Sequence, residues 1–248
     1  MQELSIIIPA YNEENRIRKT LEEYSIFFSE KCGDNFEIIV VLNGCKDDTL
    51  GVVKSIAKKN KQIIYLDIKE AIGKGGAVTE GFKMAEGGLI GFVDADNSTK
   101  PEAFYDLVRN IGGHDCIIAS RWIKGAKVSP KQPINRRIAS RIFNIMTRIL
   151  FGIKVWDSQC GAKLFKKEVI KSVINNLGIT RWAFDVDLLY QLKKKKYSVY
   201  EIPTVWNDSE GSKLDVKKAS VEMFLAIARL RLIYSPLRFI VRIYDKLK

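Results

Sequence analysis

The sequence predicts an α/β fold in which helices flank a doubly wound, mostly parallel β-sheet. Short apolar runs alternate with segments of helical periodicity about 10–15 residues long, which is the pattern of repeated βαβ units. The run at 89–93 is apolar throughout and lies between Gly87-Gly88 and a polar turn, as strands buried on both faces do. It ends at Asp94-Ala95-Asp96, and open α/β sheets place their ligands at the carboxyl ends of strands.

The first half of the chain, 1–120, is expected to be a nucleotide-binding half-fold. Strands are predicted over 4–9, 36–42, 63–67, 89–93 and 116–120, where apolar residues are concentrated. Helices are predicted over 17–28, 50–59, 73–84 and 101–108 from their periodicity. Asn12 is expected to cap the first of these helices.

The second half is less regular. We expect a loop over 121–135, a cationic helix over 136–151, a polar turn over 157–161 and a return to the core at 164–165. A helix that begins near 182–187 and reaches 194 is expected next, then a strand over 197–202, a polar loop over 206–213, a helix over 219–231 and an amphipathic tail over 234–248. No repeat or linker is visible, so one domain is expected over 1–248, with halves over 1–120 and 121–215 and a helical tail over 216–248.

Composition limits the functional classes. Hydrophobic residues make up 46% of the chain and charged residues 28%, which is typical of globular proteins and excludes the disordered class. The net charge of +12 indicates anionic partners: nucleic acid, nucleotide phosphates or an acidic membrane surface. Four separated cysteines and the single His114 favour neither a disulfide framework nor a zinc site. No signal peptide or membrane-spanning run is recognised, so an intracellular protein without a transmembrane anchor is expected.

Asp94 and Asp96 would point to the same side of an extended strand, where two carboxylates repel each other unless a cation lies between them. A hard divalent ion that also binds substrate phosphates is the simplest solution. The alternative is that the two aspartates only form the turn that ends the strand.

Two further turns have residues suited to a nucleotide. The segment 73–77, Gly-Lys-Gly-Gly-Ala, lets backbone amides approach a phosphate at a helix N-terminus, although a simple tight turn would also explain it. The segment 9–13, Pro-Ala-Tyr-Asn-Glu, could stack Tyr11 on a base and place Glu13 on a ribose hydroxyl, with an ordinary capped turn as the alternative.

In this order, the segments resemble the family 2 glycosyltransferases of GT-A fold. Residues 5–13 are similar to the opening strand and turn of that family, 73–77 to its glycine-rich turn and 94–96 to its metal-binding triplet. Segments 157–165, 181–189 and 210–214 further resemble the polyprenyl-phosphate sugar synthases, with the dolichyl-phosphate glucosyltransferases closest and the mannose synthases next.

The resemblance implies a hexosyltransferase that moves a sugar from a nucleotide sugar to a polyprenyl or dolichyl phosphate, with inversion of the configuration at the anomeric carbon. UDP-glucose or another UDP-hexose is the expected donor, and Mg²⁺ or Mn²⁺ is the expected cofactor. The half over 1–120 would bind the donor and the half over 121–215 the acceptor. The product would be a lipid-linked sugar used in glycosylation.

The resemblance also implies roles for individual residues. The catalytic residues would be Asp94, Asp96 and Asp185, with the metal on Asp96 and, through water, on Asp94. Contacts with the nucleotide sugar are expected from Pro9, Tyr11, Glu13, Asn43, Asp47, Gly73, Lys74, Asp94, Ala95 and Asp96. The acceptor phosphate is expected on Arg121, Arg136, Ser140, Ser212 and Lys213, the last two of which could also close over the nucleotide phosphates. Candidates for sugar or acceptor contacts are Asp157, Gln159, Trp182 and Asp187.

Three positions depart from the family pattern. Leu42-Asn43 stand where the family usually has paired aspartates, so the identity of the nucleotide base stays undetermined. Ser98 replaces a metal-binding glutamine of the mannose synthases, and Asp208 replaces an arginine of theirs. Both differences argue against a mannose synthase.

The implied acceptor is a membrane lipid. Residues 136–151 and 234–248 mix basic and apolar side chains as interfacial helices do, so a peripheral protein on the cytoplasmic face of a membrane is expected. Core-facing helices with basic outer faces are the alternative.

Two other functions stay open. One is transfer to a glycan or polysaccharide hydroxyl, with Asp185 or Asp187 as the base. The other, more remote, is nucleic-acid binding, for which the chain has charge but no recognisable module. We therefore expect no nucleic-acid partner, and the sequence leaves the oligomeric state undetermined.

Overall fold

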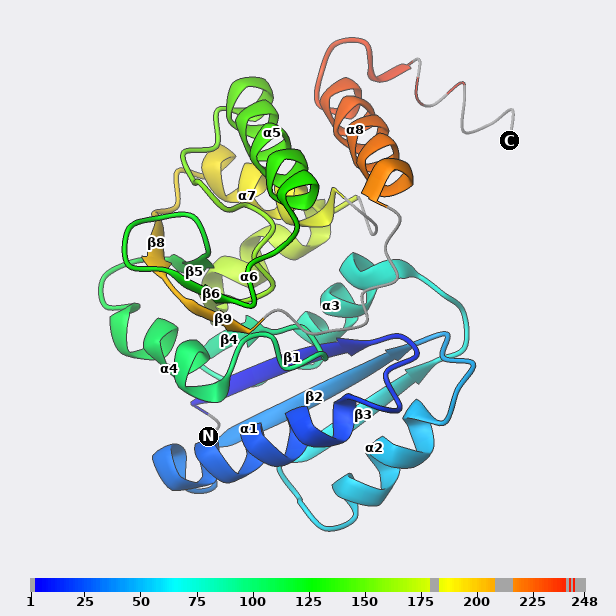
Figure 1. Cartoon of the computed structure of the whole chain (residues 1–248), viewed down its shortest axis with the longest axis vertical. Coiled ribbons are helices and arrows are strands. Elements are labelled where there is room, and N and C mark those ends of the chain that lie inside the picture. Colours follow the sequence, from blue (N-terminus) through cyan, green and yellow to red (C-terminus); the bar gives the residue numbers. More distant parts are fainter. Residues whose placement is uncertain (1–2, 179–182, 208–215, 240, 242, 244–248) are drawn as a thin grey trace.

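The computed structural model describes residues 3–178, 183–207, 216–239, 241 and 243. A seven-stranded sheet runs through the molecule in the order β3-β2-β1-β4-β7-β5-β8 (Figure 1). Its strands are β1 (Leu4–Ala10), β2 (Phe36–Asn43), β3 (Ile63–Ile68), β4 (Leu89–Phe92), β5 (Cys116–Ser120), β7 (Lys163–Lys166) and β8 (Val199–Pro203). Only β7 is antiparallel to its neighbours, so the predicted mostly parallel α/β sheet is confirmed.

Helices cover both faces of this sheet because successive side chains of a strand point to opposite faces. Ile6 and Ile8 of β1 pack with residues of α1 (Ile17–Cys32), α2 (Thr49–Ala57) and α4 (Pro101–Asn110). Ile7 packs on the other face with residues of α3 (Gly73–Met84), α6 (Lys167–Val173) and α7 (Phe184–Lys194). Both faces are therefore buried, as expected of a doubly wound sheet.

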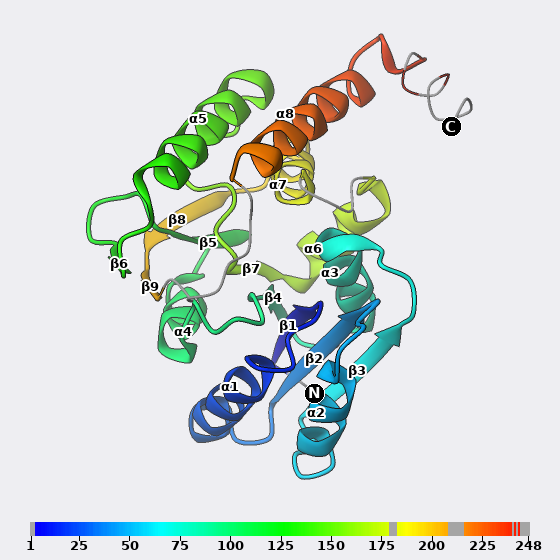
Figure 2. The same cartoon turned by 45° about the vertical axis from the view of Figure 1, so that its right-hand side comes forward.

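Two longer helices form a further layer over α7. They are α5 (Ile134–Phe151) and α8 (Val216–Ile233), which run side by side at the end of the molecule opposite α1 and α2 (Figures 1 and 2). Their inner sides reach the second core through Phe143, Phe151, Ile227 and Leu230. Among the described residues, no helix is both long enough and apolar enough to cross a membrane.

Several predicted details are wrong. The loop over 121–135 contains a strand, β6 (Lys127–Ser129), which pairs with β9 (Val205–Asn207). Trp206 therefore lies in a strand with only 4% of its surface exposed, and not in a polar loop. Helix α6 and the 3₁₀ turn Ile174–Asn176 were not predicted. Strand β7 has only four residues and α6 only seven, and such short elements give no clear periodicity in the sequence.

Asn12 does not cap α1. The N-cap position of α1 is Arg16, and no side chain caps it. Asn12 has a φ of 55° and accepts a hydrogen bond from the backbone N–H of Lys46 at 2.8 Å. It thereby ties the turn after β1 to the turn after β2, a long-range contact that the local cap pattern could not reveal.

Candidate active site

The carboxyl ends of the parallel strands β1, β2, β3 and β4 lie at one edge of the sheet, and hydrogen bonds join the segments that follow the first three. The backbone N–H of Glu13 donates to Thr49 Oγ1 at 2.8 Å, and that of Glu14 donates to Asp47 Oδ2 at 3.2 Å. The backbone N–H of Gly73 donates to Asn43 Oδ1 at 3.2 Å. Parallel strands thus bring together four segments that the sequence predicts to contact a nucleotide.

The Asp94–Asp96 segment lies beyond β4 and not within it, since the strand ends at Phe92. The strand thus ends one residue earlier than the predicted 89–93, and the alternation of an extended strand does not apply to the two aspartates. The turn is held instead by Thr20 Oγ1 of α1, which donates to the carbonyl of Ala95 at 2.7 Å. Asp96 Oδ1 accepts the backbone N–H of Ser98 at 3.0 Å.

Electrostatic coupling shows that Glu13 lies near the aspartate pair. Burial raises the pKa of the Glu13 carboxyl above its usual value, and the charges of Asp96 and Asp94 raise it further. A salt bridge from Arg16 Nε to Glu13 Oε2 (2.7 Å) offsets part of this rise. Tyr11, two residues earlier, is 49% exposed.

Lys74, in the first turn of α3, forms an ion pair with Asp94. Burial alone would lower the pKa of Lys74, but attraction to Asp94 and Asp185 raises it above its usual value, so the ammonium stays charged. Burial raises the pKa of Asp94, and Lys74 opposes that rise only in part. The glycine-rich turn and the aspartate turn therefore form one charged cluster.

Two glycines allow this cluster to assemble. A Cβ at Gly161 would overlap the Asp94 carboxylate, so the 157–161 turn approaches Asp94 only because residue 161 has no side chain. A Cβ at Gly75 would collide with the ring of Phe184, so α3 and α7 meet closely at their first turns. Asp185 follows Phe184 and is thereby brought into the electrostatic field of Lys74.

The carboxylate of Asp185 forms an ion pair with a buried lysine. Lys163 of β7 is fully buried, and its Nζ donates to Asp185 Oδ1 at 2.7 Å and to the carbonyl of Cys160 at 2.6 Å. Sequence reasoning missed Lys163. A lysine between Ala162 and Leu164 in an apolar run was the available signal, because a buried cation requires a partner.

Arg121 and Asp157 form a second buried ion pair. Arg121 Nε and Nη2 donate to the two oxygens of Asp157 at 2.8 and 2.9 Å, and the Arg121 backbone N–H donates at 3.0 Å. Burial would raise the pKa of Asp157, but Arg121 outweighs burial and holds that pKa below its usual value. The guanidinium also lies 4.9 Å from the ring centre of Trp206. Asp157 thus binds Arg121 and does not face an open ligand site.

Two of the other acceptor candidates lie on α5. Arg136 and Ser140 are both half-buried and are separated by one helical turn. Within the described residues, Ser140 Oγ and Trp122 Nε1 are buried without a hydrogen-bond partner. Asn144, one turn further, accepts the backbone N–H of Ser158 at 2.8 Å and so connects α5 to the 157–161 turn.

Asp187, two residues after Asp185, has different partners among the described residues. It is fully buried, accepts Tyr234 Oη at 2.6 Å and accepts the backbone N–H of Gly178 at 3.0 Å. Gln159 is half-buried within the 157–161 turn, and Pro9 is half-buried between the buried Ile8 and Ala10 at the end of β1. Trp182, Ser212 and Lys213 lie outside the residues that the structure describes.

Comparison with known proteins gives a consistent result. Residues 5–174 match the protein family described as "Glycosyl transferase family 2". The dolichyl-phosphate beta-glucosyltransferase of Dictyostelium discoideum is 34% identical, with 93% of this chain and 74% of the relative aligned. The protein of the same name from Saccharomyces cerevisiae is 31% identical over 93% of this chain and 75% of its own length.

Solved structures resemble the fold at lower identity. Glucosyl-3-phosphoglycerate synthase of Mycobacterium tuberculosis, in complex with Mn²⁺, UDP and glucosyl-3-phosphoglycerate, superposes with a TM-score of 0.67 and 17% identity over 94% of this chain and 79% of that one. Mannosyl-3-phosphoglycerate synthase of Rubrobacter xylanophilus superposes with a TM-score of 0.70 and 16% identity over 93% and 74%.

Proposed function

This chain belongs to glycosyl transferase family 2 and has the GT-A fold, and from that premise we propose that it transfers glucose to dolichyl phosphate. The proposed donor is UDP-glucose. The configuration at the anomeric carbon would invert because the acceptor phosphate attacks that carbon from the side opposite the departing UDP. One observation carries the proposal: Lys74, Asp94 and Asp185 meet at the carboxyl edge of the sheet, in a chain whose relatives are named dolichyl-phosphate beta-glucosyltransferases.

In the proposed donor site, the turns after β1 and β2 hold the nucleoside. The exposed ring of Tyr11 is suited to stack on the base, and the Glu13 carboxylate is suited to accept a ribose hydroxyl. Asp47 supports this arrangement through the turn, since its carboxylate binds Thr49 and the backbone N–H of Glu14. Asn43 has an amide that could contact a base edge but already accepts the N–H of Gly73, so we assign it to positioning the phosphate turn.

Asp94 and Asp96 fit a magnesium or manganese ion. Both offer hard carboxylate oxygens, and such ions bind one or two protein carboxylates together with water and substrate phosphates. Within the described residues, no cluster of three or more His, Cys, Asp or Glu side chains could hold a metal, so the other ligands would come from the donor and water. When bound, the ion would stabilise the charge that develops on the departing diphosphate.

We assign Lys74 to the diphosphate. In the unliganded protein its ammonium neutralises Asp94, the aspartate that a cation would otherwise neutralise. A donor diphosphate at the N-terminus of α3 would offer Lys74 a second anionic partner at the positive end of the helix dipole. Lys74 would then leave Asp94 available to the metal.

The acceptor phosphate is already ionised near neutral pH, so the reaction does not require a strong base. We assign Arg136 and Ser140 of α5, with Ser212 and Lys213, to holding that phosphate. Since two nitrogens of Arg121 bind Asp157, Arg121 would orient the acceptor segment and offer its remaining nitrogen to the phosphate. Asp185, with Lys163 on one oxygen, would use the other to orient the sugar.

The proposed acceptor carries a long prenyl chain, so the reaction would take place at a membrane. We propose that the protein acts peripherally, on the cytoplasmic face, where nucleotide sugars are available. The product would be a lipid-linked glucose that serves glycosylation.

A ligand panel and a transfer assay test the function. UDP-glucose with Mn²⁺ should raise the unfolding temperature more than GDP-mannose with Mn²⁺ does, because a ligand that binds only the folded state stabilises it. Glucose should then pass from UDP-glucose to a short-chain prenyl phosphate in solution and not to free oligosaccharides. Absence of a shift with any nucleotide sugar would contradict the proposal, and transfer to the oligosaccharides alone would favour the glycan-hydroxyl alternative.

A further inference from the structure

One side of α5 is apolar and points away from the core. Five isoleucines at helical spacing are each more than half exposed, and Ile149 reaches 76%. They are Ile134, Ile138, Ile142, Ile145 and Ile149. Solvent exposure of a continuous row of large apolar side chains is unusual on a globular protein and marks a surface that another apolar phase covers.

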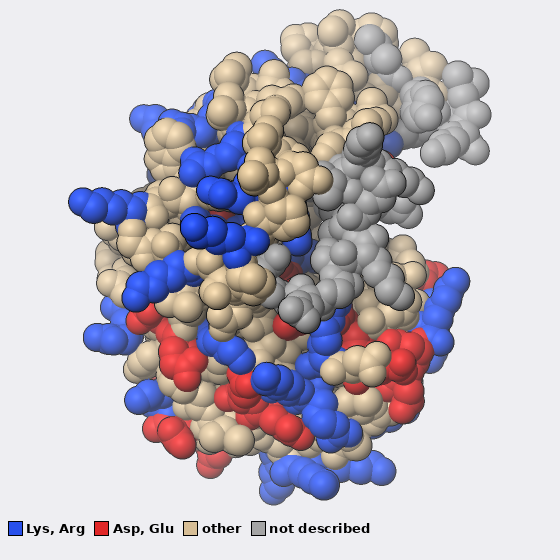
Figure 3. Space-filling model, in the orientation of Figure 1, with Lys and Arg blue, Asp and Glu red and all other residues tan. Residues whose placement is uncertain are grey.

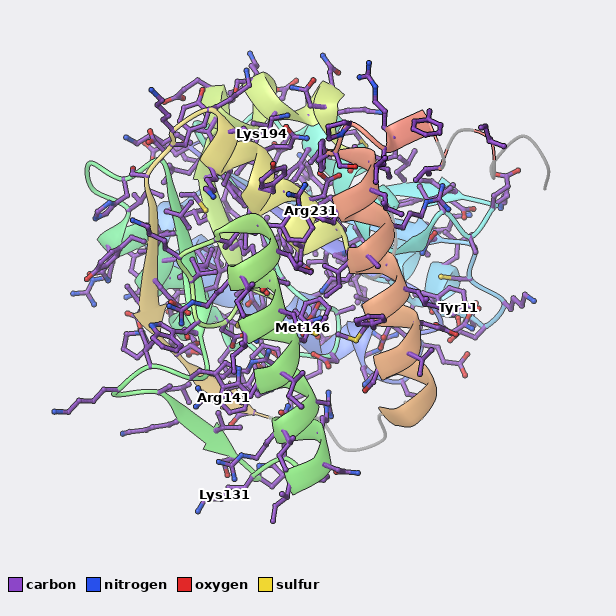
Figure 4. The ribbon with its side chains drawn as sticks, turned by 90° about the horizontal axis from the view of Figure 1, so that it is seen from above. Tyr11, Lys131, Arg141, Met146, Lys194 and Arg231 are labelled. Atoms are coloured by element: carbon purple, nitrogen blue, oxygen red, sulfur yellow. The ribbon has the colours of Figure 1, made fainter. Side chains whose placement is uncertain are left out.

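Helix α8 extends this row sideways. It runs beside α5 with Met146 between the two helices, while Arg141 extends from the opposite side of α5 (Figure 4). Val221, Phe224 and Leu225 of α8 are each at least half exposed. We call these three residues, together with the five isoleucines, the α5–α8 face. Two parallel helices with outward apolar sides match the geometry of helices that lie in the plane of a membrane interface.

Charge distinguishes a lipid surface from a protein partner. The segment 134–156 contains five basic residues and no acidic one. In Figure 3, the part of the molecule formed by α5 and α8 is mostly uncharged with basic residues along its border, whereas acidic residues gather in the opposite half. The α5 part of this surface carries cations and no acidic residue, although α8 carries the exposed Glu222 and Glu201 accepts the backbone N–H of Trp156. A predominantly basic border around an apolar surface complements an acidic leaflet, in which phosphates surround an apolar interior.

A groove lies at the C-terminal end of this row. It measures about 420 Å³ and is lined by Ile145, Arg148, Ile149, Gly152, Ile153 and Lys154. The lining therefore consists of isoleucines, one glycine and two cations. Within the described part of the chain, no carboxylate pairs with Arg148, whose guanidinium instead lies 3.8 Å from the ring centre of Trp156.

Trp156 is 48% exposed, so this stack stands at the rim of the α5–α8 face. Tryptophan is the residue that prefers the headgroup level of a bilayer, and arginine binds phosphate oxygens bidentately. The carbonyl of Phe151, at the negative end of α5, is already bound by Lys193 Nζ at 2.7 Å. The groove can therefore attract an anion despite its position at a helix C-terminus.

We propose that this groove binds the phosphate of an acidic phospholipid through Arg148 and Lys154, while the α5–α8 face lies on the acyl region of the same leaflet. The inference rests on the proposed function, and it adds a lipid site separate from the acceptor site. Arg136 and Ser140, assigned to the acceptor phosphate, lie near the other end of α5. A helix anchored by its C-terminal end would thus lie along the leaflet that contains the prenyl phosphate.

Vesicle sedimentation tests the proposal. The wild-type chain should bind phosphatidylcholine–phosphatidylglycerol vesicles more tightly than phosphatidylcholine vesicles. Removal of two basic residues that contact an acidic leaflet should weaken binding about 30-fold, so we expect that loss for Arg148→Gln/Lys154→Gln. The matched control is Lys58→Gln/Lys59→Gln, which removes the same charge from exposed positions beside α2 at the opposite end. It should bind acidic vesicles nearly as the wild type does.

Ile149→Ser provides a second variant, which changes no charge and should fold normally because the side chain of Ile149 is 76% exposed. It should weaken binding to both kinds of vesicle. All variants should retain the wild-type rate of glucose transfer to a short-chain prenyl phosphate in solution, which separates this inference from the proposed function. Equal weakening by both double substitutions, or absence of vesicle binding by the wild type, would overturn the proposed site.

Discussion

Lys163 Nζ lies 2.7 Å from Asp185 Oδ1, and the lysine side chain that makes this contact is fully buried. The pair joins β7, the antiparallel strand between β4 and β5, to the first turn of α7. The lysine neutralises Asp185, one of the three aspartates expected to be catalytic, at a position that solvent does not reach.

Lys163→Met should therefore destabilise the protein strongly, because it leaves Asp185 without its buried partner. Loss of one member of a buried pair costs about 3–5 kcal/mol, which urea unfolding would measure. Lys163→Met/Asp185→Leu should recover most of that stability without recovering glucose transfer. The exposed Lys171→Met provides the control, expected within about 0.5 kcal/mol of wild type. A stable, active Lys163→Met protein would contradict the role given to the pair.

Asp96→Ala should abolish most of the transfer activity, because Asp96 is the proposed direct metal ligand. We expect a loss of at least about 2.7 kcal/mol of transition-state stabilisation, a hundredfold in kcat/KM. Calorimetry of Mn²⁺ with UDP should show weaker binding in the same variant. Asp106→Ala, an exposed position on α4, should leave both quantities unchanged. Retained turnover in Asp96→Ala would exclude the proposed metal site.

Lys74→Gln should have opposite effects on two ligands. Without its ammonium, Asp94 loses its counter-ion, so Mn²⁺ alone should bind more tightly to the variant than to wild type. UDP should bind more weakly, because the diphosphate loses a charge-assisted contact of about 1.5–3 kcal/mol. Isothermal titration of each ligand separately measures both. Parallel changes in the two affinities would show that Lys74 does not alternate between Asp94 and the diphosphate.

The free energy of unfolding should decrease in acid, in part because the Asp157 carboxylate becomes protonated. Its folded pKa is held below the usual value by Arg121, while in the unfolded chain it returns to about 3.9. The ionised carboxylate therefore contributes stability that is fully present above the unfolded pKa and is lost as the pH falls through the folded pKa. Urea unfolding in acidic buffers should show this slope. Asp157→Asn should be less stable at neutral pH and should have a shallower slope, and an unchanged slope would contradict the assignment.

Tyr234→Phe should distinguish the roles of Asp187 and Asp185. Tyr234 Oη donates to Asp187 at 2.6 Å, so its removal should cost about 1–3 kcal/mol of folding stability. The rate of glucose transfer should stay near that of wild type, because Asp187 binds Tyr234 and Gly178, neither of which is assigned to the reaction. A large fall in kcat without a fall in stability would place Asp187 in the mechanism instead.

Much of the fold was predictable from local patterns. Strand β5 was predicted with its observed bounds, and the runs that form β1, β2 and β4 were found because strands buried on both faces are continuously apolar. Strands β6 and β9 were missed, because strands of three residues are too short to leave a periodic signal. Asn12 was misread as a cap for a related reason: its partner, Lys46, is close only after folding.

The candidate site divides in the same way. The residue types and their order along the chain indicated a nucleotide site at the ends of parallel strands, because topology brings those ends to one edge. Tertiary structure alone decided which charges meet. It pairs Lys74 with Asp94, Arg121 with Asp157 and Lys163 with Asp185, and it turns Asp187 toward Tyr234. Ion pairs between distant segments depend on side-chain packing and desolvation, as at Gly161 and Gly75, and neither quantity is encoded in the local pattern of residues.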